Sequence, residues 1–186
     1  LMKLIKFLII IFISLPSTIK ADLNENLINE LEEGGKLIFI RHAFAPGGGD
    51  PENFDINECG TQRNLDKNGK TQAKEIGNYL SRNKILIDKV ISSEWCRCKE
   101  TALLAFKKFE TKSFLNSFYS SKFIKNKDQQ MKELKMYIKN WKSKKNLVLV
   151  THYVVISEIL DYNPSSGEIV ISDTNFKKIG NVNIEY

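Results

Sequence analysis

Histidine and cysteine are scarce in this sequence. Among 186 residues there are two histidines, His42 and His152, and three cysteines. Their spacing fits no zinc-binding pattern, so we expect no metal site. The basic residues are scattered, without a stripe interleaved with aromatic side chains, which argues against a nucleic-acid-binding protein. The sequence also lacks internal repeats and a linker that would separate a second domain.

A long apolar run is missing too. The apolar stretch at residues 7–15 is too short to span a bilayer comfortably as a permanent helix. It follows two lysines, a pattern typical of a secretory signal peptide. We predict a signal peptide at residues 1–21, with cleavage after Ala21, and one domain at residues 22–186. An uncleaved membrane anchor is the alternative, and it would be the one contact with a membrane. In both cases the domain is exported, to the periplasm or outside the cell.

The overall composition is that of an ordinary globular domain. Hydrophobic residues make up 42% and charged residues 27% of the chain, and the length suits one domain with a sizeable core. Three lysines precede the predicted cleavage point, so cleavage lowers the formal net charge from +6 to +3. So small a charge gives no reason to expect nucleic acid as a partner, although it could help to attract phosphorylated substrates.

The three cysteines allow one disulfide within the chain. Export makes such a bond possible. Cys96 and Cys98 are too close in sequence for an easy bridge, so we expect Cys59 to pair with one of them. The remaining cysteine would stay free or pair between molecules.

Apolar runs alternate with amphipathic segments, which indicates an α/β fold. We predict a three-layer sandwich with a mainly parallel sheet and helices on both faces. The predicted strands cover residues 36–40, 85–91, 146–151, 168–172 and 181–184, and the predicted helices cover residues 24–33, 67–82, 95–107, 125–142 and 154–160. Residues 113–119 are ambiguous and could form a short edge strand. Residues 43–64 form a long loop with three consecutive glycines, and loops of this length are usually functional or disordered.

Each histidine follows closely on one of the predicted strands. Arg41 and His42 come after the first strand, and Thr151 and His152 lie at the end of the third. The carboxyl ends of parallel strands meet at one edge of the sheet, where active sites gather. We therefore expect both histidines to meet there, together with the corner at residues 92–97 that follows the second strand.

The residue types at this edge suit a phosphoryl group. The guanidinium groups of Arg41 and Arg97 match the oxygens of phosphate. A neutral imidazole, such as that of His42, can attack phosphorus, and a second imidazole, that of His152, can donate a hydrogen bond to an oxygen. The arginines would supply the positive charge that a metal ion supplies elsewhere, so we expect no cofactor.

Four motifs in order along the chain carry a family resemblance. They are Ile40-Arg41-His42-Ala43, Gln62-Arg63-Asn64-Leu65, the corner from Ser92 to Ala102, and Val148-Leu149-Val150-Thr151-His152. The chain resembles the histidine phosphatase superfamily, which is phosphoglycerate mutase-like, from about residue 36 to residue 160. Its exported context and cysteine-rich corner are similar to those of a small bacterial periplasmic branch.

The resemblance implies a role for each matching residue. His42 corresponds to the nucleophile that becomes transiently phosphorylated. Arg41 and Arg97 correspond to the arginines that clamp the phosphate, and His152 to the second histidine of the pocket. Arg63 would line the mouth of the pocket or, equally well, support the long loop.

The general acid is where the sequence departs from the family. Many members carry a glutamate between the arginine corner and the late histidine, whereas residues 114–131 here offer only Asp128. The acid phosphatase branch has an aspartate directly after that histidine, and this chain has Tyr153. The possible acids are therefore Asp50, Glu52 and Asp55 on the long loop and Glu94 at the corner, and the sequence does not choose among them.

We therefore expect an exported, metal-independent phosphatase that hydrolyses phosphomonoesters through a phosphohistidine. Its substrate would be a phosphorylated small molecule, an envelope sugar phosphate or a phosphoprotein. The alternative is a non-catalytic phosphate-binding or interaction module of the same fold. A mutase is a third possibility, against which the short segment between the arginine corner and the late histidine argues.

Overall fold

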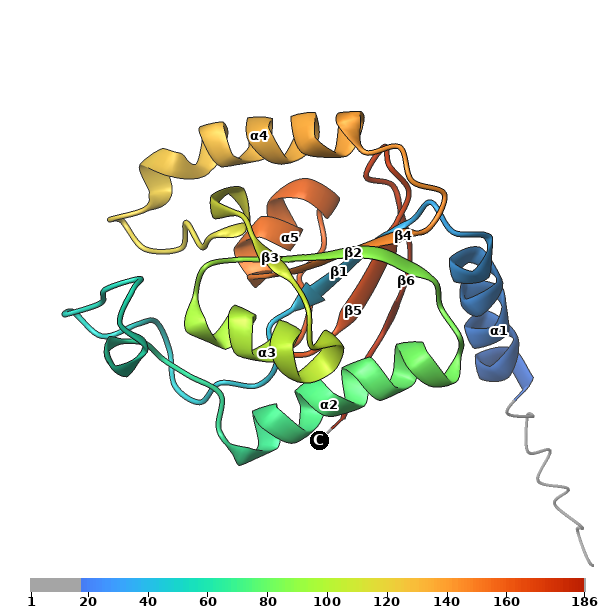
Figure 1. The fold of residues 1–186 in the computed structure, drawn as a ribbon, viewed down its shortest axis with the longest axis horizontal. Helices are drawn as coiled ribbons and strands as arrows, with labels where there is room; N and C mark the ends of the chain where they lie inside the picture. Colours follow the sequence, from blue (N-terminus) through green and yellow to red (C-terminus); the bar gives the residue numbers. More distant parts are fainter. Residues whose placement is uncertain (1–17, 186) are drawn as a thin grey trace, which may run out of the picture.

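A six-stranded sheet runs through the middle of the molecule, with helices on both of its faces (Figure 1). The computed structural model describes residues 18–185. In the sheet the strands follow the order β3-β2-β4-β1-β5-β6. The strands are β1 (Leu37–Arg41), β2 (Ile87–Ser92), β3 (Glu110–Thr111), β4 (Asn146–Thr151), β5 (Ile169–Ser172) and β6 (Lys178–Val182). The α-helices are α1 (Thr18–Glu33), α2 (Lys67–Arg82), α3 (Cys96–Phe106), α4 (Lys127–Asn140) and α5 (Tyr153–Leu160).

The sheet is mainly parallel, as the sequence predicts. The strands β3, β2, β4 and β1 pair in parallel, whereas β5 and β6 close the sheet in antiparallel pairs. Arg41 is in register with Thr151, and Ser92 with Val150. Two backbone bonds of 2.9 Å extend this alignment past the strand ends, one from His42 N to Thr151 O and one from Ser93 N to Val150 O. The three corners that carry the predicted site residues therefore lie side by side.

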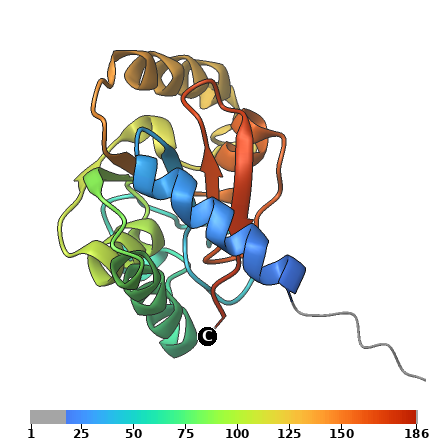
Figure 2. The same ribbon diagram turned by 90° about the vertical axis from the view of Figure 1, so that its right-hand side faces the viewer.

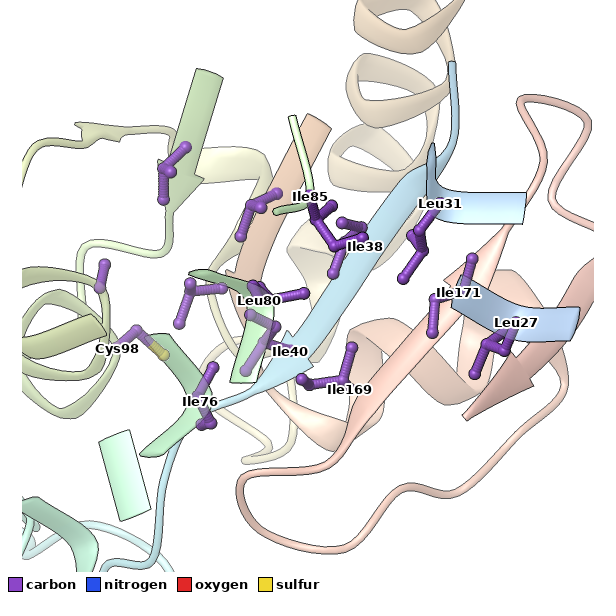
Figure 3. Close-up of a cluster of buried hydrophobic side chains, with 14 of the residues drawn as sticks. Leu27, Leu31, Ile38, Ile40, Ile76, Leu80, Ile85, Cys98, Ile169 and Ile171 are labelled. Carbon is purple, nitrogen blue, oxygen red and sulfur yellow. The ribbon is translucent and has the colours of Figure 1, made fainter. Parts of the chain in front are cut away.

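Alternating side chains of the strands enter two separate cores. Ile38 and Ile40 of β1 face α1, α2 and α3, and Figure 3 shows them among the buried side chains of that layer. Leu37 and Phe39 point to the opposite face and pack under α4 and α5. Because the period of a strand is two residues, one continuous apolar run fills both cores, as is typical of parallel sheets with both faces covered.

The helix α1 covers the side of the sheet near its antiparallel strands (Figure 2). Its Leu27 packs so closely on Gly180 of β6 that a Cβ there would lie 2.9 Å from the leucine side chain. The helix begins at Thr18, earlier than the predicted start at residue 24, and it includes residues 18–21 of the predicted signal peptide. The rest of that segment lies outside the described residues. No helix within residues 18–185 is long and apolar enough to cross a membrane.

Two predicted strands differ from the structure. Residues 113–119 form no edge strand; Ser113–Leu115 is a 3₁₀ helix, and the edge strand is β3, just before it. Phe114 and Leu115 are both buried in the core under α4 and α5, whereas consecutive side chains of a strand would point to opposite faces. The last strand, β6, covers Lys178–Val182 rather than residues 181–184. Apart from the start of α1, the other elements agree with the prediction to within two residues.

Candidate active site

A cavity of about 610 Å³ opens where the three corners meet. All five residues predicted to bind or attack the phosphoryl group line it: Arg41, His42, Arg63, Arg97 and His152. These residues come from two strand ends, a helix and the long loop, so only the folded chain brings them together.

His42 presents an unprotonated nitrogen to this cavity. Its Nδ1 lies 2.8 Å from the carbonyl oxygen of Ala43. Since a carbonyl can only accept, Nδ1 carries the proton and Nε2 keeps its lone pair. The Nε–H of Arg97 donates to that lone pair over 3.2 Å. Burial, followed by the charge of Arg97, holds the pKa of His42 well below its ordinary value, so the ring is a neutral base at physiological pH.

His152 is oriented by a chain of hydrogen bonds. Its Nε2 lies 2.9 Å from Ser93 Oγ, which itself donates to Asn116 Oδ1 over 3.0 Å. The amide of Asn116 is fixed in turn, because its Nδ2 donates to Glu94 Oε2 over 2.6 Å. Ser93 therefore accepts the Nε2–H of His152, and the Nδ1 lone pair faces Arg97 Nη2 at 3.5 Å. Burial, with the charge of Arg97 next, lowers the pKa of His152 well below its ordinary value.

The three arginines leave donors for an anion. Arg97 is buried, with 3% of its surface exposed, and sits in the first turn of α3. Arg41 donates through Nη1 to Pro164 O over 2.9 Å and lies over the ring of Tyr153. Within the described residues, Arg41 Nε and Arg63 Nε are buried and have no hydrogen-bond partner. Buried unpaired donors are unfavourable, so both guanidinium groups keep hydrogen-bonding capacity that the free protein does not use.

Arg63 combines the two roles that the sequence left open. It lines the cavity, and its Nη1 donates to the carbonyl oxygens of Ala45 and Gly47 in the long loop. The charged group is therefore held where the loop borders the cavity.

Two of the candidate acids, Asp50 and Glu94, occupy different places relative to the cavity. Glu94 does not line the cavity. Asp50 does, but its carboxylate forms an ion pair with Arg97 at 2.7 Å. Burial by itself raises the pKa of Asp50, yet the hydrogen bonds and charge of Arg97 outweigh that effect and hold the pKa below its ordinary value. Asp50 is therefore ionised and Glu94 lies outside the cavity lining, so the structure favours neither as the proton donor.

A disulfide joins the long loop to α3. Cys59 pairs with Cys96, which confirms that Cys59 bonds to one of the two later cysteines. Next to this bridge, Gln62 Oε1 accepts from Cys96 N over 2.9 Å. Cys98 is buried and free, with Sγ 3.5 Å from His152 Nε2. Burial raises the pKa of the Cys98 thiol to about 12, so it stays protonated.

One wall of the cavity escaped the sequence analysis. Residues 117–123 follow the short 3₁₀ helix and contribute Ser117, Tyr119, Ser120, Ser121, Lys122 and Phe123. Phe123 packs with Phe54 and Trp95 as three aromatic rings in mutual contact. The segment lacks a regular period, so its sequence gives no signal of this position. Among the described residues, no three His, Cys, Asp or Glu side chains gather in a way that could hold a metal ion.

Several solved structures have the same arrangement of strands and helices. A phosphoglycerate mutase from Thermus thermophilus is 15% identical to this chain, with a TM-score of 0.56 over 81% of this chain and 99% of that chain. The protein histidine phosphatase SixA, solved with tungstate, is 15% identical, with a TM-score of 0.53 over 78% and 95%. The product of the open reading frame Rv3214 from Mycobacterium tuberculosis is 18% identical, with a TM-score of 0.54 over 73% and 89%.

These likenesses confirm the predicted α/β fold of the phosphoglycerate mutase type. This is also the fold that the resemblance carried by the four motifs implies. No protein-family model matches the sequence, and neither does any curated protein.

Proposed function

We propose that this chain, whose fold is of the phosphoglycerate mutase type, is a metal-independent phosphatase that forms a phosphohistidine at His42. One observation carries the proposal. A neutral imidazole directs the lone pair of its Nε2 into a cavity lined by Arg41, Arg63 and Arg97. A nucleophile surrounded by fixed cations suits a phosphate ester, whose negative charge repels most nucleophiles in water.

In the first step, His42 Nε2 attacks phosphorus, a P–N bond forms and the ester P–O bond breaks. The leaving oxygen takes the electron pair of that bond and a proton from an acid. In the free protein, Arg97 Nε donates a hydrogen bond to the lone pair of His42 Nε2. Once that lone pair has formed the P–N bond, Arg97 Nε donates to a phosphoryl oxygen instead. In the second step, water attacks phosphorus, the P–N bond breaks, and phosphate leaves with His42 neutral again. The proton from water returns to the group that served as the acid.

Among the candidate carboxyl groups, that of Glu52 is best suited to act as the general acid. It lines the cavity together with Asp50, and within the described residues its carboxylate takes part in no ion pair and no hydrogen bond. Its backbone carbonyl accepts a hydrogen bond of 3.3 Å from Nζ of Lys122, another residue of the cavity wall.

Leaving-group dependence tests this assignment. In Glu52→Gln we expect kcat for an alkyl phosphate to fall by about 10²–10⁴-fold, because an alkoxide needs a proton to leave. Hydrolysis of p-nitrophenyl phosphate should change little, since nitrophenolate leaves without one. Glu32→Gln is the control, because that carboxylate lies on an exposed part of α1, outside the cavity. Equal losses on both esters in Glu52→Gln would show that the residue is not the acid.

The space beyond the phosphate admits a sizeable leaving group. A second cavity, of about 700 Å³, shares Phe54, Trp95 and Phe123 with the first as walls. The candidate substrates are a phosphorylated small molecule, an envelope sugar phosphate and the phosphorylated side chain of a protein. One of the similar structures is described as a protein histidine phosphatase, so a phosphohistidine protein belongs among the substrates to be tested.

We also propose that the domain is exported. The apolar run after two lysines supports export, and so does the disulfide between Cys59 and Cys96, a bond that persists in oxidising compartments. Expression of the full chain in a bacterium, followed by fractionation, should give a shortened product in the periplasm. Recovery of the full-length chain in the cytoplasm would contradict export.

The decisive assay is hydrolysis of p-nitrophenyl phosphate in the presence of EDTA, beside His42→Ala. We expect turnover in the wild type and none in the variant, whose affinity for tungstate should persist because the arginines remain. Activity retained in His42→Ala would refute the phosphohistidine mechanism. Anion binding without turnover on any ester would instead identify a phosphate-binding module. Turnover that needs a bisphosphate primer would identify a mutase.

A further inference from the structure

We propose that Asp50 is a positioning residue that holds the Arg97 guanidinium with one edge turned toward the reacting phosphoryl group. This inference rests on the proposed phosphatase function. It gives a role to a residue that the sequence analysis considered only as an acid.

The Arg97 guanidinium presents two edges, and they have different partners. Its Nη1 and Nη2 donate to the two carboxylate oxygens of Asp50, over 2.7 and 3.2 Å. Its Nε lies 3.2 Å from His42 Nε2, and the same Nη2 lies 3.5 Å from His152 Nδ1. The edge formed by Nε and Nη2 therefore faces the space between the two imidazoles. A phosphoryl group bonded to His42 Nε2 would occupy that space.

The carboxylate of Asp50 is itself firmly held. Besides Arg97, it accepts from the indole Nε1–H of Trp95 over 3.1 Å and from the backbone N–H of Arg63 over 3.1 Å. Its side chain is 18% exposed, and that of Arg97 is 4% exposed. A bidentate pair with this little solvent defines the plane of the guanidinium as well as its position.

The long loop brings Asp50 to this place from far along the chain. Gly47 and Gly49 have φ angles of 88° and 72°, a conformation that other residues rarely adopt, and they let the loop turn back just before the aspartate. The disulfide at Cys59 and the bonds from Arg63 to the loop carbonyls fix the rest.

A different role for the same contact is that Asp50 blocks the site as an internal anion and leaves when substrate binds. The geometry favours positioning, because Asp50 occupies only the outer edge of the guanidinium and leaves the inner edge to the ligand. Displacement would also leave a partly buried carboxylate without its main partner, which is costly. The two roles predict opposite effects of removing the carboxylate.

Chemical rescue tests the proposal. In Asp50→Ala, the loss of orientation should lower kcat for p-nitrophenyl phosphate by about 10²-fold. It should also weaken the binding of inorganic phosphate by roughly 10-fold. Formate should restore part of kcat, because its carboxylate fits between Arg97 and Trp95. Asp50→Asn keeps the shape of the side chain and one acceptor, so it should fold, lose less activity and not respond to formate. Asp128→Asn, at an exposed position of α4 and outside both cavities, is the control.

The outcomes separate the roles. Tighter phosphate binding in Asp50→Ala, with inhibition by formate, would identify a blocking anion and overturn the proposal. Unchanged kcat and phosphate affinity in both Asp50 variants would overturn it as well. Wild type and His42→Ala are measured alongside. A wild type that hydrolyses no phosphate ester refutes the phosphatase function, and phosphate affinity in the Asp50 variants then still tests the role of Asp50 toward Arg97.

Discussion

Removal of the disulfide between Cys59 and Cys96 should weaken both the fold and the site. The bridge ties the loop that carries Asp50 and Arg63 to the first turn of α3, where Arg97 lies. Without the bridge, the unfolded chain regains conformations that the closed loop excludes. In the folded state, the loop then depends on hydrogen bonds alone.

The sequence separation of the two cysteines sets the size of the effect. They are 37 residues apart. A closed loop of that length lowers the entropy of the unfolded chain by about 13 cal/mol/K, equivalent to about 4 kcal/mol at 25 °C. Domains are usually stable by about 5–15 kcal/mol, so the loss is a large share of the total. For a chain of this size, it corresponds to a fall in Tm of about 8–16 °C.

Urea denaturation of the wild type and of the double variant Cys59→Ser, Cys96→Ser measures the difference. A reductant should lower the stability of the wild type to that of the double variant and leave the variant unchanged. The affinity for inorganic phosphate should fall in parallel, because Asp50 and Arg63 lose an anchor of their loop. A difference in unfolding free energy below about 1 kcal/mol would refute the loop-closure reasoning.

Three further predictions concern stability. Burial keeps His42 and His152 neutral, with lowered pKa values, so the unfolded chain alone takes up protons below about pH 6.5. The free energy of unfolding should therefore be constant above that pH. At lower pH it should decrease by up to about 1.4 kcal/mol per pH unit for each ring. Urea denaturation at a series of pH values measures this, and a stability that stayed constant down to roughly pH 5 would contradict the prediction. In Gly77→Ala, the new Cβ would lie 2.2 Å from a backbone carbonyl oxygen of α3, so we expect a loss of roughly 1–3 kcal/mol in thermal unfolding, against a much smaller change in Gly48→Ala, where nothing lies within 4 Å. The hydroxyl of Thr101 accepts a hydrogen bond of 3.0 Å from the backbone N–H of Ala43, the residue after His42. Thr101→Val removes this acceptor and should lower the free energy of unfolding by about 1–3 kcal/mol, whereas Thr101→Ser should keep most of the wild-type stability. Equal stability of the two variants would show that this bond is unimportant.

Much of the fold could be read from local pattern. The apolar runs that became β1, β2 and β4 report burial on both faces of a parallel sheet, and the period of α2 reports a single buried face. These patterns can be recognised in the sequence because they depend only on which face of an element is buried, and not on which side chains pack against that face. Where the pattern was weak, at residues 113–119, the sequence left the structure ambiguous, and the edge strand that it allowed does not form.

The site residues that the sequence could place are likewise those beside regular strands and helices. His42, His152, Arg41 and Arg97 stand in or next to elements with clear patterns, so the topology of a parallel sheet was enough to place them at one edge. The sequence by itself thus determined the fold class, the edge where the site lies and the residue types that suit a phosphoryl group.

Only the tertiary structure decided how those residues are held. Asp50 pairs with Arg97, which is 47 residues away in sequence, and Ser93 donates a hydrogen bond to Asn116, which is 23 residues away. Cys59 forms its disulfide with Cys96 and not with Cys98, two residues further on. These contacts join irregular loops whose course depends on the packing of the whole domain, and no local period records it. The physical reason is that burial repeats along a regular element, whereas the direction of a hydrogen bond between two loops is set by the one place where the chain brings them together.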